Sequence, residues 1–438
     1  MRPPTTRQTA AARTWALAAL LSLSGLLSAQ AAPCEAGAYG TADQSIVVLE
    51  PKPWIPPSGL GYLLLDGRYG STTSPTSPVQ CAHGRVRAQA PGETRVVLAQ
   101  RSFKRTALRF TVAGAELAGE LLEPLERGAP SQRPLVVMVH GSETEPAIHN
   151  TRALMLAAQG IAVFTYDKRG TGQSGGFYTQ NFELLADDAA AAMQQAQALA
   201  AGRFSKAGYW GQSQGGWVAP LAATRSRADF VVVSFGLISS PIAEDRDQML
   251  LEAERLKLGP RERDWIAQLS RATAVLVSSH FSTGFEALES IRQAIGHEAW
   301  AHSLKGEYSG DMLRMQDRDL RRVGRAVFDN LELIWDYDAE QVLKQLSLPM
   351  LWIVAGQDRE APAEASLAAL AKLQAQGKPF EVYVFPDTDH GMNEFLELPD
   401  GSRRNTRVTD GYFRLLGDWI LGRLAPPYGR GQVRGGAF

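Results

Sequence analysis

The sequence lacks several features that would place it in common functional classes. Only two of its 438 residues are cysteine, which excludes a disulfide-rich scaffold and a zinc site built from cysteine clusters. Its formal charge is −1, from 45 basic and 46 acidic residues, and this balance argues against a general nucleic-acid binder. No His-Glu-x-x-His is present, and no Gly-x-Gly-x-x-Gly follows the first strand-like run. We therefore expect no metal and no cofactor.

The chain also has no apolar stretch long enough to cross a membrane. The longest one runs from residue 15 to about residue 27, whereas a spanning helix needs about 20 apolar residues. Three arginines precede it, and Ala29-Gln30-Ala31 follows it as a small-x-small cleavage site. We predict a signal peptide over residues 1–31 and an exported mature chain, periplasmic or secreted, without a stable membrane anchor.

The two cysteines, Cys34 and Cys81, lie near the start of the expected mature chain. In an oxidising compartment such a pair favours a disulfide, with two unpaired thiols as the alternative. A bond between them would close a loop of about 46 residues and stabilise the fold by about 3 to 4 kcal/mol. Neither cysteine has neighbours that indicate metal binding or catalysis.

The mature chain divides into regions with different patterns. Residues 32–107 are rich in proline, glycine, serine and threonine, with short apolar pieces, which predicts a β-rich accessory region. Residues 108–236 and 347–438 alternate apolar runs with alanine-rich, helix-length segments. Strands that are apolar throughout are buried on both faces, so we expect an α/β fold with a mostly parallel sheet flanked by helices. The apolar runs are residues 135–139, 161–166, 230–233, 351–354 and 382–385, and the clearest crossover helices are residues 181–199 and 363–376.

Residues 237–346 interrupt this alternation. They carry Arg, Glu, Asp and Leu at helical spacing and no convincing strand, which predicts a helical insertion between two strands of the sheet. Such an insertion either forms a cap over the strand ends or only adds surface. We expect a cap, or lid.

The segment Gly211-Gln212-Ser213-Gln214-Gly215 predicts a serine nucleophile. It follows an apolar, strand-like run and precedes a helix-compatible stretch, and its two glycines allow a tight turn that exposes the serine hydroxyl. Ser174 lies in a second match to the pattern, Gly172-Gln173-Ser174-Gly175-Gly176. That match sits in a polar, glycine-rich loop several residues after the nearest apolar run, so we expect Ser174 to be a loop residue.

A serine nucleophile needs a base and a group that orients the base, and the chain supplies both in a consistent order. Asp358 directly follows one apolar run, and His390 follows the last one. The order Ser213, Asp358, His390 is typical of three residues at the carboxyl ends of strands in one parallel sheet. We expect all three to be catalytic.

Other acids and histidines remain alternatives. Asp387 and Asp389 lie close to His390 in sequence, and Asp336 and Asp338 lie near the end of the predicted lid. Asp358 is favoured because the orienting carboxylate has to reach the imidazole from a different strand end. His140 also follows a strand, and we expect it to orient the adjacent loop rather than to act as the base.

Acyl transfer also requires hydrogen-bond donors for the oxyanion of the tetrahedral intermediate. His140-Gly141-Ser142 follows the apolar run 135–139, which places the backbone N–H of Ser142 near the same sheet edge. The backbone N–H of Gln214 opens the helix after the nucleophile. Ser142 and Gln214 are therefore the expected oxyanion donors.

Taken in order, these motifs resemble those of the α/β-hydrolase superfamily. They are His-Gly after one strand, the run from Tyr166 to Ser174 after the next, then Gly-Gln-Ser-Gln-Gly, Gly-Gln-Asp and Asp-His-Gly. The resemblance covers about residues 108 to 425 and implies a cap inserted after the sixth strand, which residues 237–346 match. The branch is similar to exported serine hydrolases grouped with esterases and with prolyl oligopeptidase-like or serine aminopeptidase-like enzymes.

The function predicted from these residues is hydrolysis of a carboxylic ester through an acyl-enzyme. A serine peptidase or amidase is the alternative, because the same three residues cleave amides. A catalytically silent binding protein is a further alternative. The expected partner is a small-molecule ester or a short peptide, and the sequence does not indicate an oligomeric state.

Overall fold

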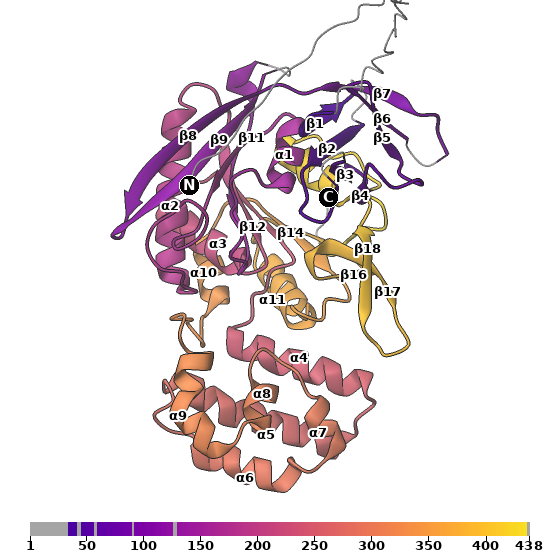
Figure 1. Cartoon of the computed structure of the whole chain (residues 1–438). Helices are drawn as coiled ribbons and strands as arrows, with labels where there is room; N and C mark the ends of the chain where they lie inside the picture. Colours follow the sequence, from indigo (N-terminus) through magenta and orange to yellow (C-terminus); the bar gives the residue numbers. More distant parts are fainter. Residues whose placement is uncertain (1–33, 42–44, 57–58, 90–91, 126–128, 436–438) are drawn as a thin grey trace, which may run out of the picture.

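A nine-stranded sheet forms the centre of the protein (Figure 1). The structure is a computed structural model and describes residues 34–41, 45–56, 59–89, 92–125 and 129–435. The signal peptide predicted over residues 1–31 lies outside the described residues and stays a prediction.

The central sheet is mostly parallel, as the apolar runs predicted. Its order is β19-β15-β14-β13-β12-β10-β11-β9-β8, and the strands from β15 to β11 in this order pair in parallel. Strands β9, β8 and β19 pair antiparallel at the two edges. The bounds are β8 (Phe103–Val112), β9 (Ala115–Pro124), β10 (Leu135–Val139), β11 (Ala162–Tyr166), β12 (Ala207–Gln212), β13 (Phe230–Ser234), β14 (Met350–Ala355), β15 (Phe380–Phe385) and β19 (Gln432–Val433). The expected fold class is confirmed.

Helices cover both faces of the sheet because alternate strand residues point to opposite sides. In β10, Val137 and Val139 pack into one core cluster, whereas Val136 and Met138 pack into another. The first cluster includes side chains of α2 (Phe182–Leu199), α3 (Gly215–Arg225), α10 (Ala339–Gln345) and α11 (Glu364–Ala375), and the second includes α1 (Thr151–Ala158) and α12 (Tyr412–Leu421). Each such buried aliphatic side chain contributes about 1.5 to 3 kcal/mol.

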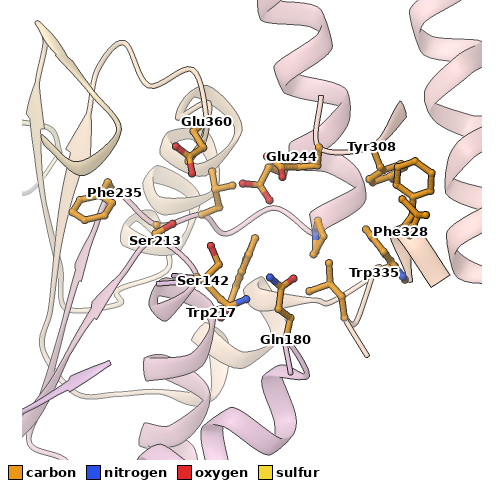
Figure 2. A pocket seen from close by; sticks show the side chains of 18 residues that line it. Ser142, Gln180, Ser213, Trp217, Phe235, Glu244, Tyr308, Phe328, Trp335 and Glu360 are labelled. Atoms are coloured by element: carbon orange, nitrogen blue, oxygen red, sulfur yellow. The ribbon is translucent and has the colours of Figure 1, made fainter. Parts of the chain in front are cut away.

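The helical insertion lies between β13 and β14 and forms a separate body below the sheet in Figure 1. Its helices are α4 (Pro241–Arg255), α5 (Pro260–Ser278), α6 (Phe285–Ile295), α7 (Ala299–Ser303), α8 (Ser309–Arg314) and α9 (Asp317–Phe328). They share their own apolar core, which includes Met249, Leu276 and Trp335. A cavity of about 220 Å³ separates this cap from the strand ends (Figure 2).

The last helix of the expected insertion differs from the rest. We placed the insertion at residues 237–346, but α10 packs against the core of the sheet through Ala339, Val342 and Leu343. Its apolar face therefore belongs to the helix layer next to α3 rather than to the cap.

The N-terminal region forms a second, seven-stranded sheet in which all described pairs are antiparallel. Its strands are β1 (Gly37–Gly40), β2 (Ile46–Glu50), β3 (Gly61–Leu64), β4 (Tyr69–Ser71), β5 (Val79–Ala82), β6 (Arg85–Ala88) and β7 (Val96–Gln100). Ala38, Ile46 and Val48 join the same core cluster as α1, so this sheet packs on one face of the central domain. The expected β-rich accessory region is therefore present, as is the helical cap.

The boundary expected between residues 107 and 108 falls inside β8. This strand begins at Phe103 and pairs along its length with β9 in the central sheet. It is an edge strand in which half of the residues are exposed, among them Lys104 and Arg105, so no apolar run marked its start.

Two smaller features complete the described fold. After β15 come the short strand β16 (Thr388–Asp389), the turn η2 (His390–Met392) and the hairpin of β17 (Asn393–Glu397) and β18 (Arg403–Val408). A second short turn, η1 (Pro130–Gln132), precedes β10. Within the described ranges no helix has the length and apolar character needed to cross a membrane.

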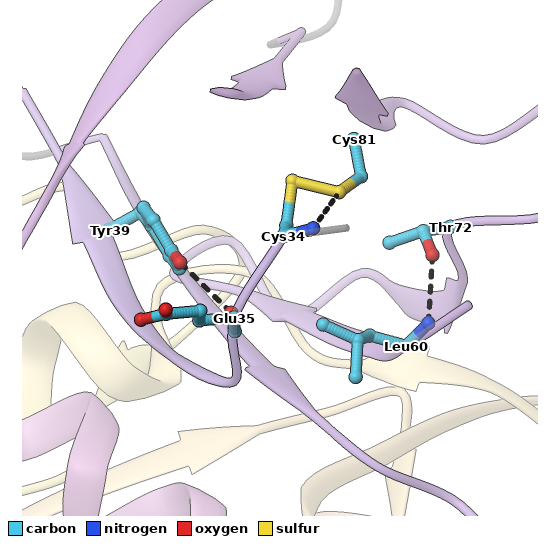
Figure 3. Close-up of a disulfide and its surroundings, with 6 residues drawn as sticks. All are labelled: Cys34, Glu35, Tyr39, Leu60, Thr72 and Cys81. Atoms are coloured by element: carbon cyan, nitrogen blue, oxygen red, sulfur yellow. Dashed lines mark hydrogen bonds between the residues drawn. A yellow bond between two sulfur atoms is a disulfide. The ribbon is translucent and has the colours of Figure 1, made fainter. Parts of the chain in front are cut away.

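A disulfide joins Cys34, just before β1, to Cys81 in β5 (Figure 3). Beside it, the hydroxyl of Tyr39 donates a hydrogen bond of 2.9 Å to the backbone carbonyl of Glu35. The predicted pairing of the two cysteines is present, and it ties the start of the N-terminal sheet to the strand at its far edge.

Removing this disulfide is expected to destabilise the protein. A Cys34→Ala/Cys81→Ala double variant restores freedom to a long loop of the unfolded chain, so we expect a loss of about 3 to 4 kcal/mol in the free energy of unfolding. Chemical unfolding of the oxidised protein, the reduced protein and the double variant measures this. The reduced protein should match the double variant, and equal stability of all three would contradict the prediction.

Candidate active site

Ser213 lies on a sharp turn between β12 and α3. Its φ angle is +50°, in the left-handed region that non-glycine residues rarely adopt. The turn is possible because the flanking glycines lack side chains. A Cβ on Gly211 would lie 2.1 Å from the carbonyl oxygen of Gly215, and one on Gly215 would lie 2.2 Å from that of Val139. The backbone therefore holds the Ser213 hydroxyl above the sheet edge.

Ser213, His390 and Asp358 form one chain of hydrogen bonds. The Nε2 atom of His390 lies 3.0 Å from Ser213 Oγ, and its Nδ1 atom lies 2.9 Å from Asp358 Oδ2. Asp358 is only 3% exposed, and its other oxygen accepts the backbone N–H groups of Glu360 and Ala361 at 3.0 and 2.8 Å. The carboxylate is thus fixed on both sides and can hold one orientation of the imidazole.

The surroundings of His390 favour its charged form. Burial alone would lower the pKa of this imidazole, but the hydrogen bond and charge of Asp358, with the charges of Glu360 and Asp389, raise it above its ordinary value. The ring of Phe235 meets the imidazole edge-on, with the ring centres 5.0 Å apart. This arrangement suits a base that becomes an imidazolium during the reaction.

The alternative acids have other contacts. Asp389 accepts the backbone N–H groups of His390 and Arg359 and pairs with Arg403 at 2.8 Å, so it fixes backbone rather than the imidazole. Asp387 pairs with Arg430. Asp338 caps the start of α10, and Asp336 is exposed. Among these acids, Asp358 is the one hydrogen-bonded to the imidazole.

The two expected oxyanion donors line the cavity beside the nucleophile. In the described part of the chain, the backbone N–H groups of Ser142 and Gln214 have no hydrogen-bond acceptor. Gly141 brings the first of these loops against the nucleophile, because a Cβ there would lie 3.1 Å from the Cβ of Ser213. Gln214 stands at the N-terminal end of α3, where free N–H groups favour negative charge.

The cavity above Ser213 has an apolar wall and an acidic one. The residues that line it are Ser142, Gln180, Ser213, Gln214, Trp217, Phe235, Gly236, Leu237, Pro241, Glu244, Glu307, Tyr308, Val327, Phe328, Leu333, Trp335, Glu360 and Ala361. Figure 2 shows the carboxyl groups of Glu244 and Glu360 above Ser213, with Trp217 and Trp335 on the other side. The core and the cap both contribute to it.

Sequence reasoning did not find the acidic wall. Glu360 could have been noticed, since it lies two residues after Asp358 in the same loop. Glu244 and Glu307 lie in the cap and carry no local signal. Burial and the charges of Glu307, Glu360 and Asp358 raise the pKa of Glu244 well above its ordinary range. Such a wall disfavours further negative charge.

Ser174 and His140 have no contact with the Ser213 hydroxyl among the described hydrogen bonds. The Ser174 hydroxyl donates to the carbonyl of Asp167 at 2.7 Å and accepts the N–H of Ala118 at 2.9 Å. His140 is buried, with Nδ1 3.3 Å from the carboxylate of Glu143. Ser174 thus joins the loop after β11 to β9, and His140 lies beside Glu143 of its own loop.

Comparison with known proteins agrees with this fold. The model of the family described as serine aminopeptidase, S33, matches residues 130–392, which is more than half of the chain. The chain therefore belongs to this family, within the α/β-hydrolase superfamily. No curated protein matches the sequence significantly.

Solved structures show more distant likenesses. An acylaminoacyl peptidase from Pyrococcus horikoshii is 16% identical, with a TM-score of 0.40, and the match covers 78% of this chain and 45% of the peptidase. An esterase from Pyrococcus furiosus is 14% identical, with a TM-score of 0.40, over 66% of this chain and 83% of the esterase. Est1E from Butyrivibrio proteoclasticus, with ferulic acid bound, is 15% identical, with a TM-score of 0.39, over 72% and 97% of the two chains. This chain spans less than half of the peptidase's length, and these likenesses carry no argument about substrate.

Proposed function

We propose that the protein is an exported serine hydrolase that cleaves a carboxylic ester through an acyl-enzyme on Ser213. The observation that carries the proposal is the hydrogen-bonded chain from Ser213, which lines the cavity, through His390 to Asp358. The disulfide and the predicted signal peptide support export.

In the proposed reaction, Ser213 Oγ attacks the ester carbonyl carbon while His390 Nε2 takes the hydroxyl proton. The carbonyl oxygen becomes an oxyanion and accepts the N–H groups of Ser142 and Gln214, and Asp358 stabilises the imidazolium. The bond to the alcohol oxygen then breaks, and His390 returns its proton to the leaving alcohol. A water molecule, deprotonated by His390, attacks the acyl-enzyme and releases the acid and the free Ser213 hydroxyl.

The apolar wall favours an ester with an apolar group. Trp217, Phe328 and Trp335 line the cavity together with Leu237 and Leu333. These side chains can bury an aliphatic or aromatic acyl or alcohol group, and burial of such a group favours binding by about 25 cal/mol per Å².

The acidic wall favours a second candidate, a peptidase or amidase that binds a free ammonium group. Glu244, Glu307 and Glu360 approach the cavity from the cap and from the loop after β14. Gln248 of the cap donates hydrogen bonds to both the Glu307 carboxylate and the Glu360 backbone carbonyl. Burial, and after it the neighbouring negative charges, raise the pKa of Glu244, and a cation bound there would offset those charges. Among the described residues, these carboxylates do not form a group suited to a metal ion.

The nucleophile is tested by covalent labelling. We expect a fluorophosphonate probe to label the wild-type protein and Ser174→Ala but not Ser213→Ala, since of these two serines Ser213 is the one hydrogen-bonded to an imidazole. Mass spectrometry locates the adduct. Persistent labelling of Ser213→Ala would rule out this nucleophile, and an unlabelled, folded wild-type protein would indicate a silent binding protein.

The base is tested by the pH dependence of kcat/KM. Because His390 must be neutral to accept the proton and its pKa is raised, activity is expected to fall with decreasing pH at a midpoint above the ordinary histidine value. Glu360→Gln removes one negative charge 3.8 Å from Nε2, so the midpoint should move to lower pH. Solvent screens the largely exposed Glu360 side chain, so the shift is expected to be below about one unit.

The matched control is Glu364→Gln at the start of α11. This carboxylate is exposed and makes no described contact with His390, so the midpoint should not move. A midpoint that is unchanged in Glu360→Gln, or that rises, would contradict the assignment.

Substrate class is tested by comparing short p-nitrophenyl esters with aminoacyl p-nitroanilides. We expect faster turnover of the esters and little effect of Glu244→Gln on them. Preference for anilides with a free α-ammonium group, lost on N-acetylation and in Glu244→Gln, would favour the peptidase instead. Glu254→Gln, exposed on the same helix α4, is the control and should change neither rate.

A further inference from the structure

The loop after β11 contains a buried lysine that the proposed reaction does not use. We propose that Lys168 is a positioning residue whose ammonium group sets the orientation of the Gly141–Ser142 peptide and thereby aims the Ser142 N–H at the oxyanion. This inference rests on the proposed function, because it assigns a role only where an oxyanion forms beside Ser213.

The lysine contacts the peptide that carries the expected donor. Lys168 is 4% exposed, and its Nζ atom donates a hydrogen bond of 2.6 Å to the carbonyl oxygen of Gly141. That oxygen and the N–H of Ser142 belong to one planar peptide group and, in the trans form, point in opposite directions. A contact that fixes the Gly141 oxygen therefore also fixes the direction of the Ser142 N–H.

The charge of the lysine adds to this geometric effect. A hydrogen bond from a charged donor is about twice as strong as one between neutral groups, and the effect is larger in a buried site. Withdrawal of electrons toward the Gly141 oxygen makes the N–H of the same amide a better donor. The ammonium also places a positive charge behind the expected position of the oxyanion.

Other residues contact the segment after β10, which contains Gly141 and Ser142. The Tyr178 hydroxyl donates to the carbonyl of Ser142, and the ammonium of Lys168 lies 5.0 Å from the centre of the Tyr178 ring. Asp167, next to Lys168, accepts the N–H groups of Ala147 and Ile148 at 2.8 and 3.0 Å. The loop after β11 thus holds both ends of the segment that follows β10.

The charged groups that face Lys168 allow its charge to change in an accessible pH range. Burial lowers its pKa to about 8, although Glu143 and Glu145 oppose the shift. Burial alone would raise the pKa of Glu143, but His140 and Lys168 lower it to about 2, and burial raises that of Tyr178. Glu143 therefore stays ionised and Tyr178 neutral at pH 7 to 9, while Lys168 loses its proton.

The test compares Lys168→Met with Lys206→Met. Lys206 is a partly buried lysine whose ammonium also lies over an aromatic ring, that of Phe230, but it stands at the start of β12. For a p-nitrophenyl ester we expect kcat of Lys168→Met to fall about 10- to 100-fold with KM nearly unchanged, since the lost interaction acts on the oxyanion. Lys206→Met should keep both constants.

A trifluoromethyl ketone, which forms a tetrahedral adduct with the serine, separates positioning from a general structural role. Its affinity for Lys168→Met should fall by the same factor as kcat/KM, whereas the affinity for the product acid stays unchanged. Unchanged kcat and ketone affinity, or equal losses for ketone and product, would overturn the proposal.

The wild-type protein provides a measurement that needs no variant. As Lys168 loses its proton above about pH 8, kcat and ketone affinity should fall severalfold in parallel. This alkaline limb should be absent in Lys168→Met, and if that variant does not fold, Lys168→Gln replaces it. A flat wild-type profile to pH 9.5 would overturn the proposal. If the wild-type protein neither reacts with the fluorophosphonate probe nor hydrolyses the ester, the proposed function itself is rejected.

Discussion

Ser213 and His390 stand 177 positions apart in the chain, and they meet because parallel strands end at a common edge of one sheet. Asp358 follows β14 and His390 follows β15, which is its neighbour in the sheet. The register of these strands therefore determines how close the three side chains lie, more than the sequence of each loop does. The turn at Ser213 strains its backbone, which has a positive φ angle, and the closely packed glycines on either side make this turn possible.

The core of the sheet was the most predictable part of the molecule. Each apolar run anticipated its strand to within two residues at either end, because strands buried on both faces have to be apolar throughout. The crossover helix expected over residues 181–199 is α2, which begins after Asn181, whose side chain caps it. The residues Ser213, Asp358 and His390 could be chosen for a related reason: Ser213 directly follows a strand-like run, and Asp358 and His390 lie in the loops that follow two others.

Features that depend on tertiary contacts were not predictable. β8 lies at the edge of the sheet and half of its residues are exposed, so the sequence of its N-terminal half resembles that of a polar loop. The apolar residues of α10 are similar in spacing to those of the cap, and only packing shows that they join the core. Glu244 and Glu307 face the cavity because of how the cap folds, and a helical pattern does not say which charged residues face inward.

The charges around the site are arranged by sign. Asp358, Glu360 and Asp389 surround the imidazole, whereas Lys168 contacts the carbonyl side of the Gly141–Ser142 peptide, whose N–H is the expected oxyanion donor. A tetrahedral intermediate separates charge in this sense, with a positive imidazolium and a negative oxygen. Groups that are fixed before the reaction need not reorganise as these charges develop, and they act more strongly in a buried site than in water. The cap lines the same cavity from the opposite side, through residues such as Glu244, Tyr308 and Trp335.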